Sequence, residues 1–88
     1  MRWTVIVAHT AQKQLAKLPA PERRRLLAAL TELEGDPFAG DVKRLTNYGV
    51  AFRRRLGVYR ILFNLNLDDG WVEVVAVERR SDETYRRR

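Results

Sequence analysis

The sequence predicts a single α+β domain of the order β-α-α-β-β-β, in which a helical hairpin packs on one face of a mainly antiparallel four-stranded sheet. Three observations support this prediction. Leucines recur at helical spacing in two segments of the first half. Runs rich in β-branched and aromatic residues stand before and after these segments. The chain has only 88 residues and no linker-like tract, so residues 1–88 are assigned to one domain.

The first strand and the first helix are predicted within the first 18 residues. Residues 2–8 are rich in β-branched side chains, and alternate residues from Trp3 to Val7 are apolar, as in a strand with one buried face. A short helix is expected from about residue 11 to residue 18, with Thr10 as its N-cap.

A second helix is expected after Pro19, with Pro21 in its first turn, where proline is well tolerated. Its apolar stripe consists of Leu26, Leu30 and Leu33. The sequence Gly-Asp-Pro at 35–37 ends this helix. Because the turn between the helices is short, we expect them to run antiparallel. Residues 35–49, rich in Gly, Asp and Asn, are expected to form a loop.

Three further strands are predicted over residues 50–56, 59–67 and 71–77. A two-residue turn at 57–58, with glycine first as a type II′ turn prefers, joins the first two strands. A second turn is expected at 68–70. Alternation places one apolar set on a single face of the middle strand: Tyr59, Ile61, Phe63, Leu65 and Leu67.

The predicted hairpin gathers arginines on one face of the sheet. With the turn at 57–58, Arg55 lies opposite Arg60, and alternation places Arg53 on the same face. Like charges directly opposite each other destabilise a sheet by up to about 1 kcal/mol per pair, so an anion is expected on this face. Phosphate suits the guanidinium fork. Arg54 is in phase with the apolar residues instead. Because the helices cover the apolar face, the arginine set is expected on the open one.

The charge of the chain also indicates a polyanionic partner. Seventeen Lys and Arg residues stand against 11 Asp and Glu residues, for a net charge of +6. The excess lies almost wholly in residues 43–88, and five arginines fall after residue 78. A one-sided basic surface favours nucleic acid or an acidic protein as the partner. The alternative is a basic surface that serves solubility alone.

Other functional classes find little support in the sequence. The absence of cysteine excludes disulfides, thiolate metal sites and a thiol nucleophile. His9 is the only histidine and offers no cluster of ligands, so neither a metal nor another cofactor is expected. No apolar run is long enough to span a membrane, and the N-terminus lacks the pattern of a signal peptide. A cytoplasmic protein without a membrane partner is therefore expected.

Three segments resemble the RelE/ParE toxin superfamily of bacterial toxin–antitoxin systems. They are LAKLP at 15–19, GVYRILF at 57–63, and VERR at 77–80, which is followed by Tyr85-Arg86. The middle segment is the most specific, since members carry a Gly-x-Tyr-Arg-hydrophobic-hydrophobic-aromatic run at this place. The resemblance covers nearly all 88 residues, agrees with the predicted order of elements and implies a single RelE-like toxin domain.

RelE-type members are endoribonucleases that cut messenger RNA, typically in the ribosomal A site. The resemblance therefore implies metal-independent attack of a ribose 2′-hydroxyl on the adjacent phosphodiester. It also implies two partners, a cognate antitoxin and mRNA on the ribosome. Catalytic roles fall on Arg60, Arg80 and Tyr85. RNA-binding roles fall on Arg53, Arg55, Arg79 and Arg86.

The sequence leaves two alternatives open. One alternative is a ParE-like toxin that inhibits DNA gyrase. The other is a catalytically inactive toxin relative that acts with its antitoxin in operon regulation. The presence of Arg60, Arg80 and Tyr85 together favours the nuclease.

Overall fold

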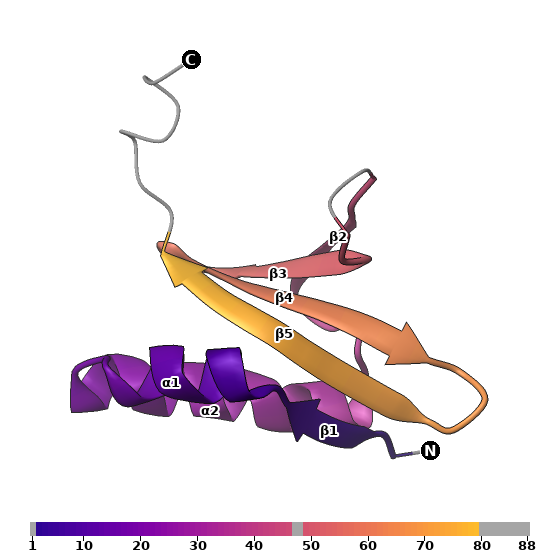
Figure 1. Cartoon of the computed structure of the whole chain (residues 1–88), viewed down its shortest axis with the longest axis horizontal. Helices are drawn as coiled ribbons and strands as arrows, with labels where there is room; N and C mark the ends of the chain where they lie inside the picture. The colour runs from indigo at the N-terminus through magenta and orange to yellow at the C-terminus, as the bar shows by residue number, and fades with distance from the viewer. Residues whose placement is uncertain (1, 47–48, 80–88) are drawn as a thin grey trace.

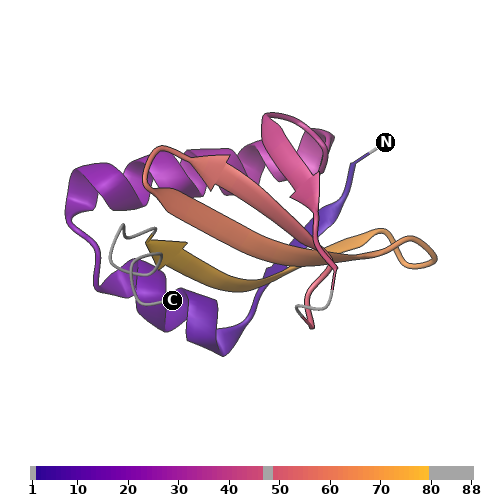
Figure 2. The same ribbon diagram turned by 90° about the horizontal axis from the view of Figure 1, so that it is seen from above.

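The computed structural model describes residues 2–46 and 49–79, which form a layer of two helices beneath a five-stranded sheet (Figure 1). The elements are β1 (Thr4–Val7), α1 (His9–Ala16), α2 (Ala20–Gly35), β2 (Asp41–Arg44), β3 (Phe52–Leu56), β4 (Tyr59–Asn66) and β5 (Trp71–Arg79). Both helices lie on one side of the sheet, and Figure 2 looks onto the other side. The predicted α+β class and the helical hairpin on one face are confirmed.

The sheet has the strand order β1-β5-β4-β3-β2. β1 runs parallel to β5, and the other neighbours are antiparallel, so the sheet is mainly antiparallel as predicted. The prediction of four strands is wrong, because β2 arises within the segment that was expected to be a loop. Only Val42 of this four-residue edge strand packs against the core, so its sequence shows no alternation that would indicate a strand.

The helices begin and end close to the predicted points. α1 starts two residues earlier than expected, and Ala8 rather than Thr10 is its N-cap. The chain stays extended through Ala8, whose amide donates to the carbonyl of Val74 at 2.9 Å, and the helix starts directly after this last sheet bond. α2 has proline in its first turn and ends at Gly35, as predicted. Neither helix has the length and apolar character that crossing a membrane requires.

The core lies between α2 and the middle strands. It buries the predicted stripe of α2 and the predicted face of β4, with Leu26, Leu33, Ile61 and Phe63 each fully enclosed. Leu67 departs from the prediction: β4 ends before it, and it is 72% exposed.

The predicted register of the β3–β4 hairpin is confirmed, since Leu56 pairs with Tyr59 and Arg55 pairs with Arg60. Gly57 has a φ of 61°, the positive value that the first position of a primed turn requires.

Arg54 is a buried charged residue on the helix side of the sheet. Its guanidinium donates to the carbonyl oxygen of Ala29 at 3.3 Å and forms an ion pair with Glu32, so it ties β3 to α2. Gly40 lies against the same guanidinium: a Cβ there would stand 2.8 Å from the Nε atom of Arg54. With a φ of 81°, Gly40 is required both by its backbone conformation and by this contact.

Candidate functional site

A row of charged residues crosses the open face of the sheet. By register, Asp41 of β2 pairs with Arg55 of β3, Arg55 pairs with Arg60 of β4, and Arg60 pairs with Glu78 of β5. The row therefore places two arginines between two carboxylates. Because opposite charges in neighbouring strands attract, the carboxylates offset the repulsion between Arg55 and Arg60.

Two arginines of this face hold carboxylates of the protein itself. Arg60 donates from Nη2 to Oε1 of Glu78 at 3.0 Å. Arg53 donates from Nη1 to the carbonyl oxygen of Asp41 at 3.0 Å and to its carboxylate at 3.3 Å. The sequence predicts that an external anion neutralises the arginines of this face. That prediction is incomplete, because Asp41 and Glu78 neutralise part of their charge.

The face nevertheless retains positive charge and free donors. Arg55 is exposed and has no ion pair within residues 2–46 and 49–79. Lys43 is also exposed and lies opposite Arg53. The Nε atom of Arg60 is buried and has no hydrogen-bond partner in the described part of the chain. The four cations around this row therefore exceed the two carboxylates, which suits a polyanion.

The predicted site residues are brought together only in part. Arg53, Arg55 and Arg60 share the open face, whereas Arg79 pairs in register with Tyr59 and is in phase with the helix side. Three predicted residues lie outside the described residues: Arg80, Tyr85 and Arg86.

Glu78 and Asp41 are the site residues that the sequence reasoning missed. Each is visible only once its strand is paired with a neighbour. The β-bulge of β5 opposite Leu62 and Phe63 shifts that pairing, and β2 was not expected at all.

Where the structure describes the chain, no three His, Asp or Glu side chains gather as metal ligands would.

Tyr59 marks the boundary between this face and the helical layer. Its hydroxyl donates to Oε1 of Glu22 on α2 at 2.8 Å, and its side chain is buried. This hydrogen bond to a carboxylate raises the pKa of Tyr59, with burial as the next cause, while nearby Arg79 acts weakly in the opposite direction. Tyr59 is therefore a structural phenol that stays protonated at neutral pH.

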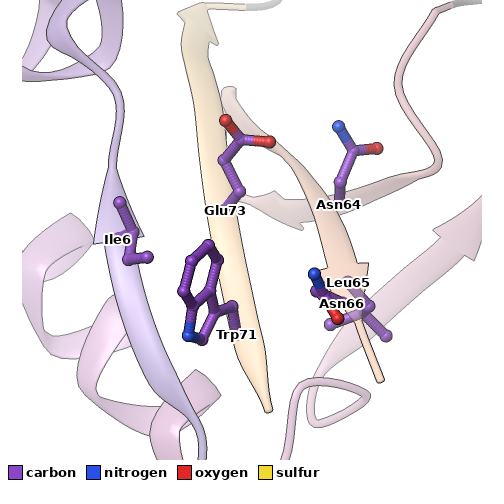
Figure 3. Close-up of a pocket in the computed structure, with 6 residues that line it drawn as sticks. All are labelled: Ile6, Asn64, Leu65, Asn66, Trp71 and Glu73. Atoms are coloured by element: carbon purple, nitrogen blue, oxygen red, sulfur yellow. The ribbon is translucent and has the colours of Figure 1, made fainter. Parts of the chain in front are cut away.

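A pocket opens on the same face toward the other end of β4 and β5 (Figure 3). Its volume is about 330 Å³, and its lining consists of Ile6, Asn64, Leu65, Asn66, Trp71 and Glu73. Trp71 is 44% exposed although it is a large aromatic residue. Asn64 and Glu73 are direct cross-strand partners, so an amide and a carboxylate stand side by side above the sheet.

The sequence matches no model of a known protein family and no curated protein. Solved structures do match. The chain is 29% identical to one from the archaeal RelE–RelB complex of Pyrococcus horikoshii, with a TM-score of 0.81 over 93% of this chain and 99% of that one. It is 26% identical to a chain of the toxin–antitoxin complex RelBE2 from Mycobacterium tuberculosis, with a TM-score of 0.80 over 91% of this chain and 100% of that one.

The isolated RelE toxin of E. coli is a more distant match. It is 20% identical, with a TM-score of 0.76 over 97% of this chain and 93% of that one, and this likeness concerns the fold. The match to RelE proteins from several species extends over nearly the whole chain and agrees with the hairpin motif at 57–63. The chain has the fold of RelE toxins, and these matches support its assignment to the RelE/ParE toxin superfamily.

Proposed function

We propose that this protein is the toxin of a type II toxin–antitoxin system and acts as an endoribonuclease on messenger RNA at the ribosome. The observation that carries the proposal is the gathering of Arg53, Arg55 and Arg60 on the face that the helices leave open. The similarity to chains of RelE–RelB complexes supports the toxin assignment. A phosphodiester is the substrate group that a set of guanidinium forks suits best.

The proposed reaction is the attack of a ribose 2′-hydroxyl on the adjacent phosphorus. The 2′-hydroxyl loses its proton as the new oxygen–phosphorus bond forms a cyclic phosphate, the bond to the 5′ oxygen breaks, and that oxygen takes a proton from Tyr85 or water and leaves as a 5′-hydroxyl. Arg60 and Arg80 stabilise the charge on the pentavalent phosphate, and one preorganised donor of this kind is typically worth about 10²–10³ in rate. Arg53 and Arg55 hold the backbone of the RNA. Tyr85 stacks on a base or transfers a proton, while Arg86 adds affinity for the RNA.

Glu78 gives the proposed site a group that can accept a proton, which arginine cannot do because it is never neutral in a protein. In the free protein its carboxylate is occupied by Arg60. When a phosphate replaces Glu78 as the partner of Arg60, the carboxylate is released next to the attacking ribose. A general base must lie within hydrogen-bond reach of the proton it removes, so this role requires the 2′-hydroxyl to bind beside Glu78.

We further propose a cognate antitoxin that covers the same face. The basic row offers ion pairs to an acidic segment of the antitoxin. If that segment folds only on binding, its ordering costs binding free energy, which a large contact area offsets. The proteins similar to this chain include chains from RelE–RelB complexes, which supports a partner of this kind.

The test replaces arginines at the proposed site. Arg60→Ala and Arg80→Ala are each expected to remove most of the growth arrest that follows induction in bacteria, because the transition-state charge loses a donor. Thermal melts of the purified variants check that the fold is retained. Arg24→Ala is the matched control, since Arg24 is an exposed arginine on α2. Full toxicity of a folded Arg60→Ala, Arg80→Ala double variant would refute this site.

A further inference from the structure

The pocket at Trp71 has a chemistry different from that of the arginine row, although both lie on the open face. Its charged member is a carboxylate, Glu73, which would repel a phosphate. Its other features are an exposed indole and the apolar side chain of Ile6, which is 38% exposed. An RNA that is held by arginines through its phosphates still presents its uncharged bases. The pocket therefore suits a base and not the backbone.

The hydrogen bonds inside the pocket show which polar groups remain for a ligand. The backbone N–H of Ala51 donates to Oδ1 of Asn64 at 2.7 Å. This bond fixes the amide, so its Nδ2 group faces away from Ala51, and Figure 3 shows that nitrogen on the side toward Glu73. Asn66 is occupied by the following turn, since its Oδ1 accepts from the amide of Asp69 at 3.0 Å and its Nδ2 reaches the same residue's carboxylate at 3.3 Å.

Besides the indole N–H of Trp71, the pocket therefore offers a ligand a donor on Asn64 and a carboxylate acceptor on Glu73. The carboxylate has no ion pair in the described ranges and is exposed. The two residues are direct cross-strand partners, which places their Cβ atoms about 4.5–5.5 Å apart. One ligand edge can therefore reach both groups.

We propose that this pocket is a base-binding subsite for the RNA and that it prefers guanine; this inference rests on the proposed function. Guanine presents two adjacent donors, N1–H and N2–H, to the two oxygens of Glu73, and its O6 accepts from Nδ2 of Asn64. Adenine and cytosine offer the carboxylate only their amino group, and uracil only N3–H. The indole of Trp71 supplies the stacking surface on which single-stranded bases are typically held.

The distance to the arginine row agrees with a subsite on the same RNA strand. Asn64 lies four residues along β4 from Arg60, on the same face of the strand, which corresponds to about 13 Å. A pocket of about 330 Å³ is within the range of small-molecule sites, about 300–1,000 Å³. A short stretch of single-stranded RNA can thus occupy both places at once.

The test is an NMR titration of the intact protein with the four ribonucleoside monophosphates. All four carry the same phosphate, so differences among them come from the base. GMP is expected to shift the NMR signals of the Trp71 indole N–H and the Asn64 side-chain amide at lower concentration than AMP, CMP or UMP. Inosine monophosphate, which lacks the 2-amino group, should bind between GMP and AMP.

Glu73→Gln should weaken GMP binding by at least about fivefold, the smallest effect expected for loss of a bidentate contact. It should also remove the preference of the protein for GMP over the other nucleotides. The control is Asp68→Asn, which removes one charge from the neighbouring turn, outside the pocket lining, and should keep the preference. Equal shifts with all four nucleotides, or an unchanged preference in Glu73→Gln, would overturn the proposal. No shift at Trp71 with any nucleotide would also overturn it and would favour a protein partner for the pocket.

This experiment is independent of RNA cleavage. An active toxin without a guanine preference would refute the subsite and leave the proposed function standing. A guanine preference in a protein that leaves RNA intact would support the subsite and refute the proposed function.

Discussion

Arg53, Arg54 and Arg55 follow one another on β3 but have different surroundings. Alternation turns Arg53 and Arg55 to the open face and turns Arg54 to the helices, where only 6% of it is exposed. There its guanidinium contacts the carbonyl of Ala29 and the carboxylate of Glu32. The same residue type therefore stabilises the fold at one position and supplies surface charge at the next.

This difference predicts opposite effects of two neighbouring alanine substitutions. Arg54→Ala should lower the free energy of unfolding by about 2–4 kcal/mol, since it leaves a cavity under α2 and removes the ion pair with Glu32 and the hydrogen bond to the carbonyl of Ala29. Arg55→Ala should change it by no more than about 0.5 kcal/mol, while RNA binding weakens. Urea unfolding and binding to a short RNA measure both effects. Similar stability losses in the two variants would contradict the assigned faces.

Among the elements, those with a strong apolar repeat were predictable from the sequence. The apolar stripe of α2 and the alternating face of β4 predicted the bounds of both elements closely. The glycine at 57 predicted the register of the hairpin. β2 was not predictable, because a strand held by edge pairing and a single core contact leaves no periodic pattern. The start of α1 was misplaced because a sheet bond, and not a side-chain cap, fixes it.

The contact between β4 and α2 through Tyr59 predicts a pH dependence. The pKa of Tyr59 is raised above the ordinary value of 10.0 in the folded state, so the unfolded chain loses this proton at lower pH. Its contribution to stability is therefore complete below pH 10 and declines as the pH rises above that value. Melting temperatures of the wild type and Tyr59→Phe between pH 8 and 11 check this. The variant should show a shallower alkaline decline, and parallel curves would contradict it.

In the whole molecule, the site follows from the two-layer architecture. The helices cover one face of the sheet, and the charged row and the Trp71 pocket lie on the other. The hairpin alone allowed Arg53, Arg55 and Arg60 to be grouped from the sequence. Glu78 could not be added, because its place next to Arg60 depends on the bulged pairing of β4 with β5 between residues distant in the chain.

At the same scale, we predict that a cognate antitoxin protects the open face. Hydrogen exchange of the complex should slow most at residues 50–62 and 79–88, because the antitoxin covers the arginines that hold RNA. The free toxin is the reference, and RNA cleavage is assayed in the same samples. Protection confined to other surfaces, with cleavage still blocked, would show that the antitoxin acts without covering the site.

Mapping RNA ends in cells shortly after induction tests our proposal that the protein cuts messenger RNA with the open face of its sheet. We expect new 5′ ends within translated messages, in phase with codons, and their loss in a folded Arg60→Ala variant. Growth arrest with intact messages and damaged DNA would contradict the claim and indicate DNA gyrase as the target.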